Sequence, residues 1–208
     1  EPPRRAAPSR VTTAMADEAI GYMKRLQEVA PGKPWLVYYV PGGTHAPHHP
    51  TPEWIKKVSD MHLFDQGWNV LRDTIFANQK RLGIMPENAQ LTEWPSTLPT
   101  WDSLSPEKKK LFVRQLDNTL IIYISGDNGA SAEGMVDGTP NEFTTFNGVP
   151  VPIKAQYLFY PFWGSDKTFP HYAAPWAWAM GTPFKWVKQV PSHFGGTAQG
   201  VAMSWPGH

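Results

Sequence analysis

Two short polar groups in this sequence carry residue types that can bind a metal ion or transfer a proton. Asp127 and Asn128 stand side by side between two glycines, directly after the apolar run at residues 120–124. A carboxylate oxygen and an amide oxygen are ligands that Ca²⁺ and Mg²⁺ prefer, and flanking glycines let the backbone approach closely. Asp-Asn-Gly is also common in tight turns. The pair therefore indicates either a hard-cation site or a turn.

The second group is the loop sequence "THAPHH", which holds His45, His48 and His49. A histidine in a loop after a strand can bind an anionic oxygen or pass a proton to a leaving group near neutral pH. Three close histidines can also ligate zinc, although Pro47 and the absence of a helical i, i+4 spacing make this pattern unspecific. A solvated loop with incidental histidines is the third interpretation.

The elements that must position these residues alternate between helix and strand patterns. Apolar spacing and capping residues predict helices from Thr12 or Thr13 to about residue 30, at 54–58, at 68–82 and at 105–115. Apolar runs rich in β-branched and aromatic residues predict strands at 35–40, at 116–124 and at 200–206. This alternation is typical of an α/β fold with a mostly parallel sheet, joined by crossovers too long for hairpins.

The predicted sheet places both polar groups in one region. Ligands of open α/β sheets bind beyond the carboxyl ends of the strands. The loop after Val40 and the loop after Ser125 would share that edge if their strands are parallel. We therefore expect His45 to lie near Asp127 and Asn128.

Composition restricts the class of protein and its partners. The chain has 208 residues, of which 41% are hydrophobic and 18% charged, so it can bury a core as a globular domain. Its net charge is +1 with scattered basic residues, and no apolar run approaches the roughly 20 residues of a membrane span. We expect neither a nucleic-acid nor a membrane partner. We divide the chain into a Pro/Arg-rich lead-in at 1–11 and one domain at 12–208.

Several segments, in order, closely resemble the arylsulfatases of the alkaline-phosphatase-like superfamily. They are "KPWLVYYVPGGTHAPHHPTPEWI", "FDQGWNVLRDTIFANQKRLGIMP", "WDSLSPEKKKLFVRQ", "LDNTLIIYISGDNGASAEG" and, before "SWP", "FPHYAAPWAWAMGTPFKWVKQVPSHFGGT". The resemblance runs from about residue 12 to the last residue. It implies an alkaline-phosphatase-like sandwich with helices on both faces of the sheet. It also implies hydrolysis of a small-molecule sulfate ester, an aryl sulfate giving a phenol and sulfate.

Carried over residue by residue, the resemblance assigns roles to the two polar groups. Asp127 and Asn128 are similar to metal ligands, usually for Ca²⁺ in this family, with Mg²⁺ or Mn²⁺ as alternatives. His45 looks like the histidine that binds the sulfate or assists the leaving group.

The same resemblance assigns roles near the end of the chain. Lys188 is similar to the lysine that holds a sulfate oxygen, and Lys185 is a rival for that role because the spacing to the following glycines differs slightly. His193 is a candidate substrate-binding residue.

The sequence also departs from the family pattern. The family's nucleophile is a formylglycine made from Cys or Ser in a C/S-x-P-x-R motif, which is absent here, as is any cysteine. The family's early paired aspartates and a long helix before "LDNTL" have no counterpart either. We therefore expect an incomplete site without turnover of its own. A phosphonate or phosphate ester hydrolase of the same superfamily, or a non-catalytic sulfatase-derived binding module, are the alternatives.

Overall fold

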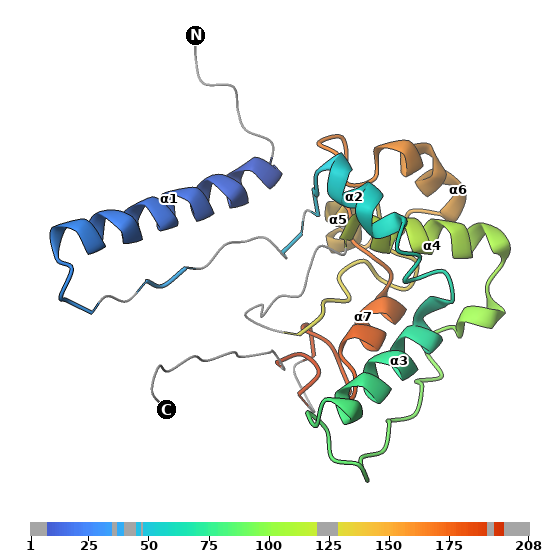
Figure 1. Cartoon of the computed structure of the whole chain (residues 1–208). Helices are drawn as coiled ribbons and strands as arrows, with labels where there is room; N and C mark the ends of the chain where they lie inside the picture. The colour runs from blue at the N-terminus through green and yellow to red at the C-terminus, as the bar shows by residue number, and fades with distance from the viewer. Residues whose placement is uncertain are drawn as a thin grey trace.

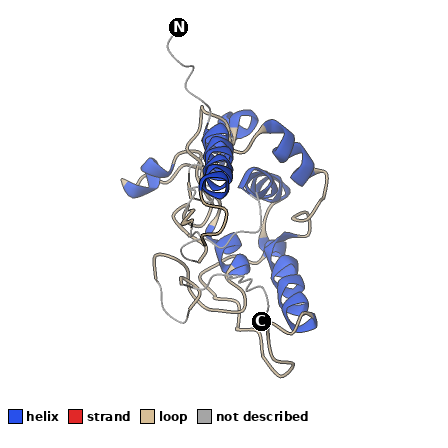
Figure 2. Cartoon of the chain, turned by 60° about the vertical axis from the view of Figure 1, so that its left-hand side comes forward, coloured by secondary structure: helices blue, strands red, loops and turns tan. Residues whose placement is uncertain are grey.

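The computed structural model describes residues 8–34, 37–39, 45–46, 48–119, 129–190 and 194–197. Within these ranges the chain is helical, and its helices are joined by long loops (Figures 1 and 2). The α-helices are α1 (Pro8–Val29), α2 (Pro52–Ser59), α3 (Gly67–Arg81), α4 (Pro106–Thr119), α5 (Glu142–Phe146), α6 (Ile153–Gln156) and α7 (Ala174–Met180). Two 3-10 segments, η1 (Trp101–Ser103) and η2 (Tyr157–Phe162), complete the set.

The α/β fold with a parallel central sheet, predicted from the sequence, is wrong. The described residues contain no β-strand, and their extended pairing is limited to three isolated bridges. Residues 37–39, the described part of one expected strand, have no ladder partner, and Tyr38 is 90% exposed. An apolar β-branched run becomes a strand only where a neighbouring strand accepts its backbone hydrogen bonds. The other expected strands lie largely outside the described residues.

Helix α4 also corrects the predicted boundary between helix and strand. The prediction ended this helix near Gln115 and began a strand at Leu116, but α4 continues to Thr119. Leu111, Phe112 and Leu116 are all buried in the core. Because Phe112 and Leu116 lie four residues apart, continuing the helix keeps both on the face that packs into the core. Packing of this face explains why the helix extends beyond the predicted boundary.

The core is built around aromatic rings from α3, α4, α7 and η1 that pack edge-on or tilted against one another. The Trp68 ring lies edge-on to Trp101 at 4.8 Å and to Trp176 at 5.3 Å between centroids, and 5.5 Å from Phe112. Two of these indoles donate hydrogen bonds to backbone carbonyls, Trp68 Nε1 to Pro99 at 3.1 Å and Trp176 Nε1 to Phe112 at 3.1 Å. Large buried aromatic rings stabilise this region, and these two hydrogen bonds satisfy the indole N–H groups of Trp68 and Trp176.

Helix α1 lies apart from this helical body (Figure 1). It begins at Pro8, inside the lead-in that we expected to run to residue 11, and none of its described side chains is buried. The Tyr39 hydroxyl donates to the Thr12 carbonyl at 3.3 Å. No helix in the described part of the chain combines the length and the apolar character needed to cross a bilayer.

Helix α7 is an element that periodicity did not predict. Its buried residues run continuously from Pro175 to Ala179, so the helix has no polar face to reveal a 3.6-residue period. It packs against α3, as Figure 1 shows. The extended segment before α7 carries His171 and Tyr172 to the polar site described next.

Candidate functional site

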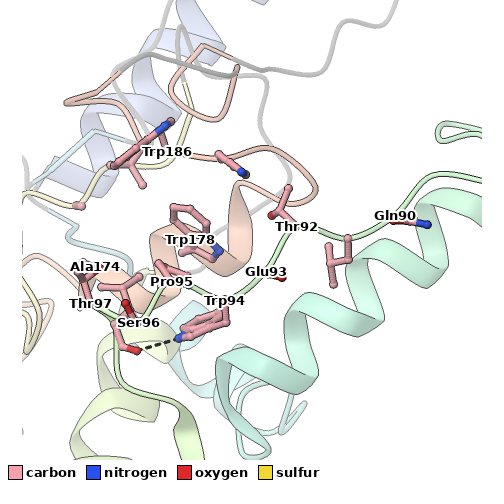
Figure 3. Close-up of a pocket in the computed structure, with 15 residues that line it drawn as sticks. Gln90, Thr92, Glu93, Trp94, Pro95, Ser96, Thr97, Ala174, Trp178 and Trp186 are labelled. Atoms are coloured by element: carbon pink, nitrogen blue, oxygen red, sulfur yellow. Dashed lines mark hydrogen bonds between the residues drawn. The ribbon is translucent and has the colours of Figure 1, made fainter.

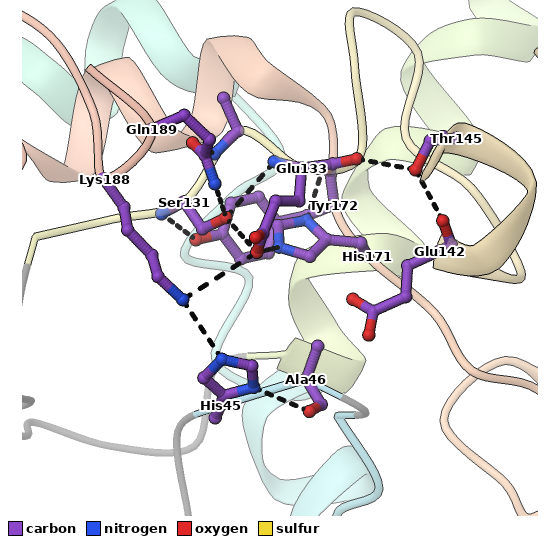
Figure 4. A network of polar contacts seen from close by, with 11 residues as sticks. His45, Ala46, Ser131, Glu133, Glu142, Thr145, His171, Tyr172, Lys188 and Gln189 are labelled. Carbon is purple, nitrogen blue, oxygen red and sulfur yellow. Dashed lines mark hydrogen bonds and ion pairs between the residues drawn. The ribbon is translucent and has the colours of Figure 1, made fainter. Parts of the chain in front are cut away.

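A network of polar side chains connects three segments that are distant in the sequence (Figure 4). The first segment contains Ser131, Glu133 and Glu142, the second contains His171, and the third contains Lys188 and Gln189. His45 approaches the network from the loop before α2. The network therefore brings carboxylates, imidazoles and an ammonium group together.

Backbone bridges explain why Glu142 and His171 are neighbours. Thr139 and His171 exchange two backbone hydrogen bonds of 2.9 Å, and the Glu142 amide donates to the Phe169 carbonyl at 2.9 Å. The Asn141 side chain caps α5 by accepting from the Phe143 amide at 3.1 Å. These contacts fix the backbone on both sides of the two functional groups.

A close approach between two backbone segments holds Glu133 beside the segment that carries His171 and Tyr172. A Cβ atom at Gly134 would lie 2.1 Å from the Tyr172 carbonyl oxygen, so only glycine fits there without a shift. The Thr145 hydroxyl donates to the Glu133 carbonyl at 2.9 Å. Gln189 reaches across to Ser131, with Nε2 donating to Oγ at 2.7 Å. The segment at 130–133 is thereby tied to the segment that carries Lys188.

One ligand atom each from Glu133, Glu142 and His171 lies within 4.8 Å of the other two. The His171 Nε2 to Glu133 Oε2 separation is 3.8 Å, which is too long for a hydrogen bond. His171 is 2% exposed and Glu142 is 5% exposed. Two carboxylates and an imidazole therefore converge, with His171 and Glu142 buried and the Glu133 side chain 21% exposed.

The environment of Glu133 favours its ionised form. Burial raises the pKa of Glu133, but the hydrogen bond from Ser131 Oγ at 2.7 Å and the nearby Lys188 ammonium outweigh burial and lower that pKa overall. The Lys188 Nζ to Glu133 Oε2 distance is 4.0 Å. Glu133 is therefore the more readily ionised carboxylate of the pair.

Glu142 lies in the opposite environment. Burial, and then repulsion from Glu133, raise the pKa of Glu142, while His45 and Lys188 oppose this rise only in part. Its Oε2 atom is buried without a hydrogen-bond partner among the described residues. Two unit charges about 5 Å apart repel by roughly 3 kcal/mol at an effective dielectric of about 20. Either a proton or a cation between the carboxylates would relieve this repulsion.

His171 presents a lone pair to these carboxylates. Its Nδ1 atom lies 3.2 Å from the Tyr172 carbonyl, a contact that requires a proton on Nδ1. Burial lowers the pKa of His171 despite the opposing effects of Tyr172 and Glu133, so the imidazole is neutral at pH 7. The unprotonated Nε2 then faces Glu133. Burial also raises the pKa of the adjacent Tyr172 hydroxyl to about 12, so that group stays protonated.

The structure brings two of the sequence-predicted site residues together. Lys188 Nζ lies 3.1 Å from His45 Nε2, and His45 Nδ1 lies 2.8 Å from the Ala46 carbonyl. Both contacts fit one neutral tautomer, with Nδ1–H donating to Ala46 and Nε2 accepting from the Lys188 ammonium. Two residues that are 143 positions apart in the sequence, and to which the resemblance gives a shared role, are thus in direct contact.

Other predicted site residues cannot be placed in the same way. Asp127, Asn128 and His193 lie outside the described residues, so the metal and substrate-binding roles given to them stay predictions. Lys185, the rival of Lys188, lines a separate pocket. His49 Nε2 contacts the Thr168 carbonyl at 2.6 Å.

The pocket that Lys185 lines has a volume of about 790 Å³ (Figure 3). Trp94 and Trp178 contribute indole rings to it, and the Trp94 Nε1 atom donates to the Leu98 carbonyl at 3.0 Å. Ala132 and Val187 also line it, next in sequence to Glu133 and Lys188. An aromatic pocket therefore borders the segments that carry the polar network.

Sequence reasoning missed Glu133, Glu142 and His171. Each stands alone in a Gly-, Pro- or aromatic-rich stretch, without the repeated spacing of a ligand motif. The available signal was a single charged or imidazole group surrounded by apolar and small residues, as in "FPHYAAPW". Such residues are seldom buried without a partner.

Comparisons with family models, curated proteins and solved structures found no match. The functional argument therefore depends on the motifs of the sequence and the geometry of the site.

Proposed function

We propose that His45 and Lys188 belong to the oxyanion-binding part of a sulfatase-type ester hydrolase, and that an aryl sulfate is its ligand. The proposal is supported chiefly by the 3.1 Å contact between Lys188 Nζ and His45 Nε2. The ordered arylsulfatase-like motifs, in which these two residues occupy the matching positions, support it independently.

The chemistry of a sulfate ester suits these groups. Hydrolysis builds negative charge on the sulfuryl oxygens and on the leaving oxygen, where positioned cationic donors stabilise it. A Lys188 ammonium supplies a compact positive charge, and an imidazole donates a proton near neutral pH. A sulfate oxygen would replace His45 as the acceptor for Lys188, and a ring nitrogen of His45 that carries a proton would donate to the same anion.

Turnover is not part of the proposal for this chain, because the formylglycine precursor motif is absent from the sequence. The predicted Ca²⁺ ligands Asp127 and Asn128 remain part of the proposed enzyme ancestry, outside the described residues. A non-catalytic module that binds a sulfated ligand through the same pair is the second candidate. It is favoured by the missing nucleophile.

Anion binding is the direct test, with Lys185→Met as the matched control for Lys188→Met. We expect calorimetric titration of inorganic sulfate at low ionic strength to show saturable binding. Loss of a charge-assisted contact should weaken this binding by about tenfold in Lys188→Met. Lys185→Met should bind sulfate as the parent protein does. Equal sulfate affinities in the parent and Lys188→Met would rule out the assigned role.

A parallel titration separates the two classes of ester hydrolase. We expect 4-nitrophenyl sulfate to bind more tightly than 4-nitrophenyl phosphate. The phosphate ester binding more tightly would move the assignment to the phosphate or phosphonate hydrolases.

A further inference from the structure

We propose that Glu133, Glu142 and His171 form a binding site for a first-row divalent metal ion, Zn²⁺ being the best fit. The assignment uses none of the predicted Ca²⁺ ligands, which lie outside the described residues, and it does not require His45 and Lys188 to bind sulfate.

The first argument is that three lone-pair donors converge. Ligand atoms of the three residues lie within 4.8 Å of one another, and the His171 Nε2 to Glu133 Oε2 separation is 3.8 Å. Two ligands of a tetrahedral zinc ion, each about 2.0–2.2 Å from the metal, lie about 3.4 Å apart. A shift of about 1 Å in the carboxylates would therefore close the site around an ion.

The second argument is independent of the first, because it concerns an unsatisfied group. Glu142 is 5% exposed, and its Oε2 atom is buried without a hydrogen-bond partner in the described part of the chain. Its carboxylate is directed into the space between His171 and His45 (Figure 4). Ten buried side-chain atoms in the described part of the chain lack a hydrogen-bond partner, and Glu142 Oε2 is the one that belongs to this cluster. Such an atom calls for an explanation, and a bound ion is one that suits a carboxylate beside an imidazole.

The third argument is the orientation of the imidazole. His171 is 2% exposed, and its Nδ1–H donates to the Tyr172 carbonyl at 3.2 Å. A histidine that ligates a metal through Nε2 characteristically donates its other ring proton to a carbonyl or carboxylate, which fixes the ring. Ser131 likewise holds Glu133 through a 2.7 Å hydrogen bond. Both ligands therefore have the supporting contacts of a metal site.

The ligand set selects the kind of ion. Ca²⁺ requires six to eight oxygen ligands, whereas one imidazole and two carboxylates match zinc or a similar first-row ion with an open position for water or another ligand. Lys188 Nζ lies 4.0 Å from Glu133 Oε2 and competes with a cation for that carboxylate. Removing the ammonium should consequently strengthen metal binding.

The test uses the full chain, stripped of metal and titrated with Zn²⁺ by calorimetry and with Co²⁺ by visible absorption. We expect one Zn²⁺ per chain, and Co²⁺ bands that show a nitrogen ligand. Glu142→Gln keeps the shape of the side chain and should weaken Zn²⁺ binding by at least about tenfold. The matched control Glu87→Gln changes an exposed glutamate and should bind as the parent does. Lys188→Met should bind several-fold more tightly.

Asp127→Asn tests whether the predicted Ca²⁺ ligand takes part in Zn²⁺ binding, and an assignment to Glu133, Glu142 and His171 alone requires Zn²⁺ binding to be unchanged. Three outcomes would overturn the proposal: no Zn²⁺ binding, equal Zn²⁺ affinities in the parent and Glu142→Gln, or binding lost in Asp127→Asn but retained in Glu142→Gln. None of these outcomes depends on sulfate, so the anion-binding proposal is tested separately.

Discussion

The tryptophan core buries neutral indole N–H groups, of which Trp163 Nε1 has no hydrogen-bond partner among the described residues, whereas the carboxylate–histidine cluster buries ionisable groups. In the core, the indole nitrogens of Trp68 and Trp176 donate to backbone carbonyls. In the cluster, Glu142 Oε2 has no hydrogen-bond partner among the described residues, and two carboxylates face one imidazole. Burial of satisfied aromatic groups stabilises the fold, whereas burial of unsatisfied charge opposes it. A local loss of stability of this kind is expected at functional sites, and favourable interactions elsewhere in the fold must compensate for it.

The largest effect should come from removing a core ring. Trp176→Ala deletes a fully buried indole that contacts Trp68, Trp101 and Phe64 and leaves a cavity. We expect the free energy of unfolding to fall by about 3–5 kcal/mol, measured by urea denaturation. The matched control is Trp54→Ala, because Trp54 is 40% exposed on α2 and its loss should change stability far less. Equal losses in the two variants would contradict the description of the core.

The second-largest loss of stability should come from adding a methyl group to the packed core. At Gly67, where φ is +79°, an added Cβ would lie 2.0 Å from the Trp101 ring. We expect Gly67→Ala to lower the free energy of unfolding by about 2–4 kcal/mol through overpacking and an unfavourable φ. Gly83 has a φ of +70° and no neighbour within 4 Å, so Gly83→Ala isolates the cost of φ alone. That cost should be about 1 kcal/mol. Thermal or urea denaturation of both variants measures the difference.

Removing a hydrogen-bond donor from the carboxylate–histidine cluster should lower the free energy of unfolding by less than the substitutions in the core. Ser131→Ala removes the hydroxyl that donates to Glu133, and we expect a loss of about 1.5 kcal/mol at pH 7. Because the pKa of Glu133 is lowered in the fold, its ionisation stabilises the protein above its ordinary pKa of 4.5. That stabilisation disappears as the pH falls through the lower folded pKa. The loss caused by Ser131→Ala should therefore shrink as urea denaturation is repeated toward acid pH.

The smallest predicted change in the free energy of unfolding should be an increase, whereas the other substitutions lower it. In the metal-free protein the pKa of Glu142 is raised, so this group favours the fold below its ordinary pKa of 4.5. That contribution is lost as the pH rises through the higher folded pKa. Glu142→Gln should then be more stable than the parent by about 1 kcal/mol at pH 7, and equally or less stable near pH 4. Urea denaturation at both pH values, with Glu87→Gln as the control, measures this reversal.

Local sequence pattern was sufficient for the helices with one apolar face. The expected helices at 54–58, 68–82 and 105–115 correspond to α2, α3 and α4, with shifted ends. It was insufficient for α7, whose buried surface runs all around, and for the end of α4, where packing of Leu116 extends the helix. The sheet was predicted from apolar runs, from their alternation with helices and from the family resemblance, but a strand depends on partners that no single segment encodes.

The residues of the candidate site likewise fall into those that the sequence could predict and those that it could not. His45 and Lys188 were identified because each lies in a longer ordered motif, and they are 3.1 Å apart in the structure. Glu133, Glu142 and His171 meet because the backbone pairs Thr139 with His171 and because Gly134 permits a close approach to Tyr172. These are tertiary contacts between unremarkable local sequences. The spacing of these residues along the sequence does not indicate such contacts.

Helix α1 has a further consequence for measurements on this protein. Its 22 residues are longer than the roughly 12–15 that an isolated helix needs to form at all in water. With no buried side chain among residues 12–29, it gains little from the rest of the molecule. Its amide protons should accordingly exchange with deuterium long before those of α3 and α7. Hydrogen exchange would therefore distinguish the low local stability of α1 from the higher local stability of the helices in the core.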